Sequence, residues 1–134
     1  MIPPPKNPEL HHTAYLVTDM ATSLQRWELL GATVELPSTL VSADQVRVAF
    51  LMFQGGRIEL VEPCGESRIK VTGAERGHPD HLCFRCDNFD EMVQGARSSG
   101  GIVVRPPVPS AAFQGKRMAF VLYRALGLIE WVER

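Results

Sequence analysis

The chain has 134 residues, enough for one domain of ordinary size or for two small modules that share a core. Hydrophobic residues make up 45% and charged residues 22%, close to the averages of globular proteins, which argues against extensive disorder. The net charge of −1 leaves no surplus of basic side chains to hold a phosphate backbone, so we expect no nucleic-acid partner.

The start of the chain predicts an extended arm over residues 1–9, because "MIPPPKNPE" is rich in proline and has no apolar centre of the kind found in signal peptides. No apolar run approaches the roughly 18 residues that a membrane span needs, so we expect no membrane partner. The odd number of cysteines argues against a secreted disulfide framework. These features together predict a cytoplasmic protein.

Residues 10–63 predict a first βαβββ module. A strand over residues 12–17 is followed by a helix that opens after the capping stretch "TDM", carries apolar residues at helical spacing and ends at Gly31. Three strand-like runs come next, "ATVEL", "VRVAFLMF" and "RIELVE", with "FQGGR" predicting a tight hairpin turn.

Residues 80–134 predict a second module of the same kind, after a linker over residues 64–79 that is rich in polar residues and glycine. A strand over residues 81–86 precedes a helix that opens at "DNFDE" and ends at Gly100. The strands "GIVVR", "KRMAFVLY" and "LIEWVE" follow. The fold class predicted is α+β, with two tandem βαβββ modules forming a cupped, barrel-like mixed sheet and helices outside.

The two modules are copies of one another. Shifting the chain by 69 residues places "HTAYLVTDMATSLQRWELLGATV" on "HLCFRCDNFDEMVQGARSSGGIV" without a gap, so that His12 falls on His81. A shift of 70 places "RVAFLMF" on "RMAFVLY", and a shift of 71 places Glu59 on Glu130. Matches at so many ordered points indicate an internal duplication.

The repeat keeps a histidine and a glutamate inside strands that are otherwise apolar: His12 and Glu59, then His81 and Glu130. If the curved sheets turn these side chains to their concave face, four ligand-type groups converge on one cavity. Two carboxylates there would repel each other and lose their hydration, and no arginine or lysine is repeated beside them. A divalent cation would neutralise both carboxylates, and the imidazoles would complete a mixed nitrogen and oxygen ligand set.

Two other sets of residues compete for such a role. His11 lies beside His12, but the repeat pairs His11 with Asp80, which favours His12. A zinc knuckle is conceivable in "HPDHLCFRC", although Cys83 and Cys86 project to opposite faces of a strand and are better explained as small buried hydrophobic residues.

The loop "RPPVPSAAFQGK" occupies the place where the second module would bound the cavity, and its prolines make it stiff. Phe113, Gln114 and Met118 are therefore predicted to line or gate the pocket. The alternative is that this loop is a plain surface connection.

The stretches "LHHTAYLVTDM", "GGRIELVEP", "HPDHLCFRCDNFD" and "GLIEWVE" resemble the vicinal oxygen chelate (glyoxalase, bleomycin resistance and dioxygenase) superfamily, across roughly residues 10–133. The pattern is most similar to members of the methylmalonyl-CoA epimerase and glyoxalase I types. The resemblance implies that one divalent ion (Co, Ni, Mn, Zn or Fe(II)) binds the four residues His12, Glu59, His81 and Glu130. It also implies a homodimer as the default assembly.

The expected activity is that of a metal-dependent epimerase, isomerase or lyase, which removes a proton next to a carbonyl of a small molecule such as an acyl-CoA or another thioester. A metal at the carbonyl oxygen stabilises the enolate, and Glu130 or Glu59 moves the proton. Methylmalonyl-CoA epimerases carry a further acid–base glutamate before the second strand after the helix, where this chain has Ala43 and Asp44. No clear set of residues for the glutathione carboxylates of glyoxalase I is present.

Two alternative functions stay open. Some members of the superfamily are metal-free proteins that bind small molecules or antibiotics and confer resistance, but they usually lack the four ligand residues. Fe(II) extradiol dioxygenases normally use two histidines and one glutamate, and they are generally longer chains.

Overall fold

The computed structural model describes residues 3–67 and 77–134, and so leaves part of the predicted linker over 64–79 outside the described residues. The chain divides into two compact units. Unit 2 holds residues 12–80, and unit 1 holds residues 1–11 together with residues 81–134. Each unit has the order β, α, β, β, β in its main segment, which confirms the α+β class with two βαβββ modules.

The elements of the chain are β1 (Glu9–Leu16), α1 (Met20–Leu29), β2 (Thr33–Val41), β3 (Val46–Phe53), β4 (Gly56–Pro63), β5 (His78–Cys86), α2 (Phe89–Gln94), η2 (Arg97–Ser99), β6 (Gly101–Pro109), η3 (Ala111–Phe113), β7 (Arg117–Tyr123) and β8 (Gly127–Glu133). Among the described residues, neither α1 nor α2 is long and apolar enough to cross a membrane.

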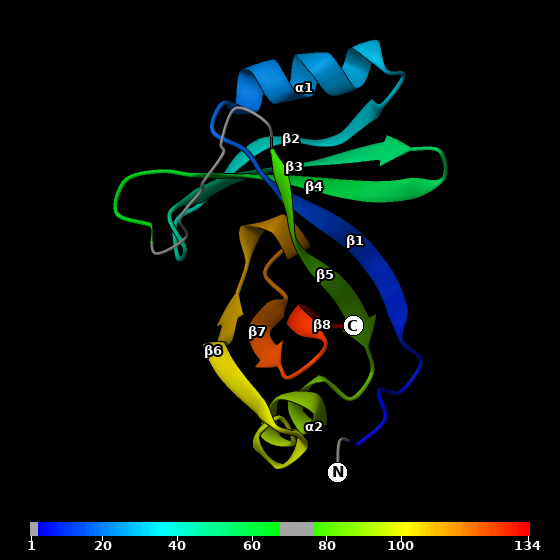
Figure 1. The fold of residues 1–134 in the computed structure, drawn as a ribbon, viewed down its shortest axis with the longest axis vertical. Helices are drawn as coiled ribbons and strands as arrows, with labels where there is room; N and C mark the ends of the chain where they lie inside the picture. Colours follow the sequence, from blue (N-terminus) through cyan, green and yellow to red (C-terminus); the bar gives the residue numbers. More distant parts are fainter. Residues whose placement is uncertain (1–2, 68–76) are drawn as a thin grey trace. The chain divides into compact units, whose positions relative to one another are not determined.

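Both units build their sheets in the same way. In unit 2 the strand order is β2-β3-β4-β1, and in unit 1 it is β6-β7-β8-β5. The last strand of each module runs parallel to the first, whereas the other neighbours are antiparallel. Figure 1 shows α1 beside β2–β4, and α2 contacts β8 in unit 1. Each helix therefore covers one face of its own sheet.

The apolar residues of each unit gather between its helix and its sheet. In unit 2 Leu51 and Leu60 are fully buried, and Trp27 of α1 packs against this core. In unit 1 Ala96 and Trp131 belong to the corresponding core, and the Trp131 indole N–H donates to the Tyr123 hydroxyl at 2.9 Å. Burial raises the pKa of that hydroxyl above its ordinary value. Because strand side chains alternate, the opposite face of each sheet carries the intervening residues.

Several predicted boundaries are wrong. β2 was predicted as "ATVEL" but continues to Val41, and β5 begins at His78 rather than at His81. The second helix was expected to reach Gly100, but α2 ends at Gln94 and is followed by a separate 3₁₀ turn, η2, that ends at Ser99. Gly100 is the C-cap of η2, and its φ of 77° suits a glycine. The proline-rich stretch after Val104 was expected to be a loop, but β6 continues to Pro109. Proline is tolerated there because β6 is the edge strand of its sheet, with register shifts near Arg105.

The N-terminal arm is attached to unit 1. The Lys6 N–H donates to the Asn88 side-chain oxygen at 2.6 Å, and the Asp87 N–H donates to the Lys6 carbonyl at 3.0 Å. The Asn88 amide also donates to the Pro4 carbonyl at 3.1 Å. Asn88 stands at the N-cap position of α2 but makes no side-chain cap, whereas Asp19 caps α1 by accepting from the Thr22 N–H. The arm thus takes the polar group that would otherwise cap the helix.

Candidate metal centre

The first pair of predicted ligands, His12 and Glu59, lies in unit 2. β1 runs parallel to β4 with Ala14 in register with Glu59, so His12, two residues earlier, projects from the same face as Glu59. The His12 Nε2 and Glu59 Oε1 atoms are 3.2 Å apart. Both side chains are almost fully buried, with 1% and 5% of their residue surface exposed. A carboxylate this deep in the protein requires a partner.

The second pair, His81 and Glu130, repeats this arrangement in unit 1. β5 runs parallel to β8 with Cys83 in register with Glu130, and His81 again lies two residues earlier. The His81 Nε2 and Glu130 Oε1 atoms are 3.1 Å apart, and the residues are 7% and 3% exposed. The structure therefore brings together the residues of each pair that the duplication predicted.

Each pair lies beside a phenylalanine that the sequence analysis did not assign to the site. The Phe50 ring lies 5.3 Å from the His12 ring, and the Phe120 ring lies 4.8 Å from the His81 ring, measured between centroids. Phe50 is in register with Glu59, and Phe120 with Glu130. The shared "AF" of the repeated strands could have revealed them. Apolar rings beside the pairs lower the local dielectric constant, which strengthens electrostatic interactions there.

The donor atoms fit a divalent metal ion. Two ligand atoms about 2.1 Å from one octahedral ion, at right angles to each other, are separated by about 3.0 Å. The separations of 3.2 and 3.1 Å within the two pairs are close to that value. Each pair supplies one imidazole nitrogen and at least one carboxylate oxygen, a set that Zn, Mn, Fe, Co and Ni ions accept.

The three residues predicted to line the pocket differ in burial: Phe113 and Met118 are buried, whereas Gln114 is exposed. Phe113 is buried in η3, and its ring meets the His11 ring edge-on at 5.2 Å, within unit 1. Met118 is 3% exposed and shares its strand face with Phe120. Gln114 is exposed and closes η3 in the left-handed region, with φ 57°. A role for these three side chains in the pocket stays a prediction.

The three cysteines are free thiols. Cys86 belongs to the helix-side core of unit 1, where burial raises the pKa of its thiol. Cys83 is in register with Glu130, on the other face of the sheet, so the two cysteines project apart as predicted. Cys64 is half-buried, and all three are unpaired with one another.

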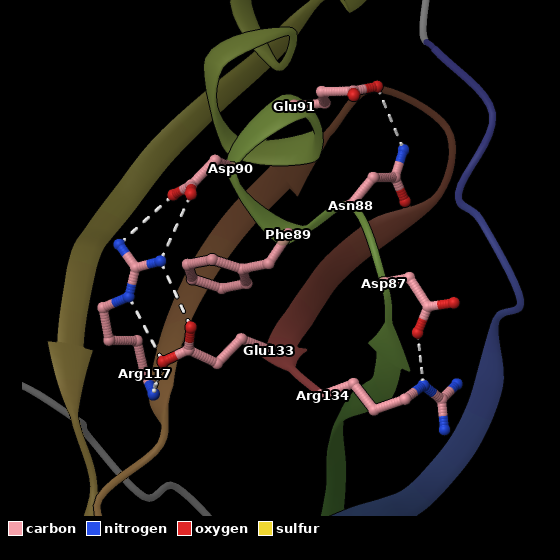
Figure 2. Close-up of a pocket in the computed structure, with 8 residues that line it drawn as sticks. All are labelled: Asp87, Asn88, Phe89, Asp90, Glu91, Arg117, Glu133 and Arg134. Carbon is pink, nitrogen blue, oxygen red and sulfur yellow. Dashed lines mark hydrogen bonds and ion pairs between the residues drawn. The ribbon is translucent and has the colours of Figure 1, made fainter.

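A separate polar pocket of about 270 Å³ opens beside the start of α2 in unit 1. Figure 2 shows the Arg117 guanidinium between Asp90 and Glu133, close to the Phe89 ring. Its Nε donates to a Glu133 oxygen at 3.2 Å, and its centre lies 5.0 Å from the Phe89 ring centroid. Carboxylates on both sides neutralise this cation, so the pocket serves to anchor the helix and β8 rather than to bind an anion.

This anchor predicts a loss of stability in acid. The side chain and backbone N–H of Arg117 hold the pKa of Glu133 below its ordinary value of 4.5. The stabilisation is therefore present above that value and is lost as pH falls through the lower pKa of the folded state. We expect the free energy of unfolding to decrease as pH falls through and below 4.5, and Glu133→Gln to reduce this dependence. Denaturant titrations across that range measure it.

The matched control is Glu28→Gln, which removes an exposed carboxylate from α1 in the other unit. An unchanged acid dependence in Glu133→Gln would show that the contact with Arg117 contributes nothing to stability.

Comparison with known proteins shows the family of this chain. A sequence profile of the Glyoxalase/Bleomycin resistance protein/Dioxygenase superfamily matches residues 6–120. The chain belongs to this superfamily. No curated protein matches the chain significantly in sequence.

Several solved structures are similar to this chain. A hypothetical protein from Bacillus halodurans is 27% identical, with a TM-score of 0.78 and coverage of 96% of both chains. Methylmalonyl-CoA epimerase from Mycobacterium tuberculosis is 22% identical, with a TM-score of 0.71 over 92% of this chain and 86% of that one. A variant of the Streptomyces coelicolor epimerase, in complex with 2-nitronate-propionyl-CoA, is 18% identical, with a TM-score of 0.71 over 97% and 98%.

Proposed function

We propose that the protein is a divalent-metal-dependent epimerase, isomerase or lyase that moves a proton next to a carbonyl group of a small molecule. The observation that carries this proposal is the buried His–Glu pair that recurs at equivalent positions in both units, with donor atoms 3.2 and 3.1 Å apart. In the proposed site His12, Glu59, His81 and Glu130 bind a single ion. The duplication supports this assignment, since each module supplies half of the set.

The protein side of the reaction follows from the two glutamates. When bound, the ion stabilises negative charge on a carbonyl oxygen of the substrate. One carboxylate, Glu130 or Glu59, takes the proton from the α-carbon, and the electron pair of the broken C–H bond moves into the enolate. The protonated carboxyl group then returns a proton to the same carbon or to a neighbouring atom. The phenylalanines Phe50 and Phe120 keep water from quenching these charges.

The proposed substrates are small carbonyl compounds with an acidic α-proton, including acyl-CoA and other thioesters. The relatedness in fold to methylmalonyl-CoA epimerases supports this class. Methylmalonyl-CoA is less favoured as the substrate itself, because this chain has Ala43 and Asp44 near the place of an acid–base glutamate. We further propose a cytoplasmic homodimer, which sedimentation of the purified protein would test.

The first test is metal content. Protein purified without chelator and without a metal-binding tag is expected to carry about one divalent ion per chain in elemental analysis, whereas His12→Ala and Glu130→Ala are expected to lose it. His78→Ala, which changes a half-buried histidine outside the pairs, is the control and is expected to retain the ion.

Activity is then screened as exchange of α-protons in deuterated water, with a panel of thioesters and free carbonyl acids. A protein that contains no metal and takes up none when Co, Ni, Mn, Zn and Fe(II) are offered would contradict the proposal. That outcome would favour a metal-free binding protein of the same superfamily.

A further inference from the structure

The sheet of unit 1 carries a row of apolar side chains near its His–Glu pair. Ile102 of β6 is in register with Leu122 of β7, and Leu122 is in register with Leu128 of β8. Residues in register on neighbouring strands project from the same face of a sheet. We call these three residues the apolar row.

The apolar row lies on the same face of the sheet as Glu130. Val121, which precedes Leu122, belongs to the core between the sheet and α2, so Leu122 projects to the opposite face. Phe120 lies two positions before Leu122 on that opposite face and is in register with Glu130. Because two residues of a strand span about 7 Å, the row is one side-chain spacing away from the His–Glu pair of unit 1.

The side chains of the apolar row are open to solvent. Ile102 is 63% exposed and Leu122 is 45% exposed, while Leu128 is half-buried. Leu126, in the turn between β7 and β8, is also 63% exposed. Single exposed apolar residues are ordinary on protein surfaces, but apolar residues grouped in this way mark a surface that binds something.

The corresponding row of unit 2 is more polar. The shifts of 69, 70 and 71 residues that align the two modules place the apolar row on three residues that are likewise in register: Thr33, Met52 and Arg57. Arg57 donates to Glu35 through Nε at 2.6 Å and through Nη2 at 3.0 Å. A sheet of this kind therefore accepts a more polar row at this place, so folding alone does not require the apolar row of unit 1.

Burial along this face of unit 1 indicates what the row binds. Leu122 is exposed, Phe120 is half-buried and Glu130 is buried, so an apolar surface runs from solvent to the pair. An alkyl chain attached to a carbonyl group at the pair would lie along Phe120 and reach the row. A second copy of the chain is the other possible occupant, but the continuity of the row with the proposed site favours the substrate.

We propose that the apolar row binds an alkyl chain of the substrate. The substrate class is then a carbonyl compound whose carbonyl group carries an uncharged chain of several carbons. Ile102 and Leu122 act as specificity-determining residues: they select and orient this chain and take no part in the transfer of the proton. This inference rests on the function proposed above for the same site.

The test compares two probes that share one metal-binding group, acetohydroxamate and hexanohydroxamate, by calorimetry on the full-length protein as purified. The second probe is longer by four methylene groups. Wild-type protein is expected to bind it at least about tenfold more tightly, at about twofold per methylene, because one side of the chain stays in solvent. The double variant Ile102→Thr/Leu122→Thr is expected to reduce this preference to about threefold or less. Threonine is the residue of unit 2 at the first position and suits a strand at both.

The matched control is Leu40→Thr, which makes the same change at a strand residue of the other unit that is 49% exposed. This variant is expected to keep the full preference for hexanohydroxamate. A preference that falls equally in Leu40→Thr would show that the longer probe binds exposed leucines in general, and would overturn the inference.

Metal content and sedimentation of the same samples separate the remaining outcomes. Wild-type protein that holds metal but binds both probes equally would overturn this inference alone, as would an undiminished preference in a folded double variant. Wild-type protein that neither holds nor takes up a metal would overturn the proposed function and this inference with it. A double variant that loses a dimer and keeps the preference would assign the row to a contact between two copies instead.

Discussion

Replacing Glu130 by glutamine is expected to lower the rate of α-proton exchange by about 10²–10⁴-fold, the range usually supplied by a positioned acid or base. Glutamine preserves the shape of the side chain, but it can neither take a proton nor offer a negatively charged oxygen to an ion. Because Glu130 is 3% exposed, solvent cannot substitute for the lost carboxylate. Stopped exchange reactions, analysed by mass spectrometry, measure the effect.

The metal content of Glu130→Gln and a control variant on the same strand show whether Glu130 acts as a ligand or as the base. If Glu130→Gln loses both exchange and metal, the carboxylate is needed as a ligand; if it retains metal without exchange, the carboxylate acts as the base. Glu133→Gln lies on the same strand but projects to the opposite face, and it is expected to change neither property. A Glu130→Gln variant with full metal and full activity would contradict the proposed centre.

Trp131→Leu is expected to destabilise the protein by on the order of 3 kcal/mol, because a large side chain leaves a core that cannot close around the space. The Tyr123 hydroxyl also loses the indole N–H that donates to it at 2.9 Å. In unit 2 the equivalent residue is Leu60, which is fully buried in a core against which Trp27 of α1 packs, whereas Trp131 shares the core of unit 1 with Ala96. At these aligned positions the larger residue is Trp27 of α1 in unit 2, but Trp131 of β8 in unit 1, where Ala96 precedes η2.

This exchange predicts strong coupling between two positions. Ala96→Trp alone is expected to overpack unit 1 and cost about 1–3 kcal/mol. Combined with Trp131→Leu, it recreates the pairing of unit 2, and the double variant is expected to be more stable than the sum of the single effects by about 0.5–3 kcal/mol. Urea denaturation of the four proteins in the cycle gives that coupling directly. Strict additivity would show that the two cores are not packed as equivalents.

The duplication explains how much could be predicted from the sequence. Repeated letters aligned His12 with His81 and Glu59 with Glu130, and the structure places each histidine against the glutamate of its own module. The order of helix and strands within each module could be predicted for the same reason. Phe50 and Phe120 are also repeated, but in the sequence they look like ordinary core residues. The alternation of a strand does not show which of its apolar residues share a face with a ligand residue.

Other features depend on contacts between distant segments, which no local pattern encodes. α2 is shorter than predicted, where Asn88 is engaged by the arm and Pro3 lies so close to Gly95 that a β-carbon there would come within 2.7 Å of it. The extension of β6 through its prolines depends on its position at the sheet edge, which only the strand order shows.

The attachment of the arm has a consequence for how the chain folds during synthesis. Unit 2 is continuous in sequence, so all of its strands are available once residue 80 has left the ribosome. Unit 1 combines the first eleven residues with residues 81–134, and Arg134 donates to the Asn7 carbonyl and to Glu9. Contacts of such long sequence separation form late. The N-terminal arm can therefore make its contacts in unit 1 only after residues 81–134 have been made.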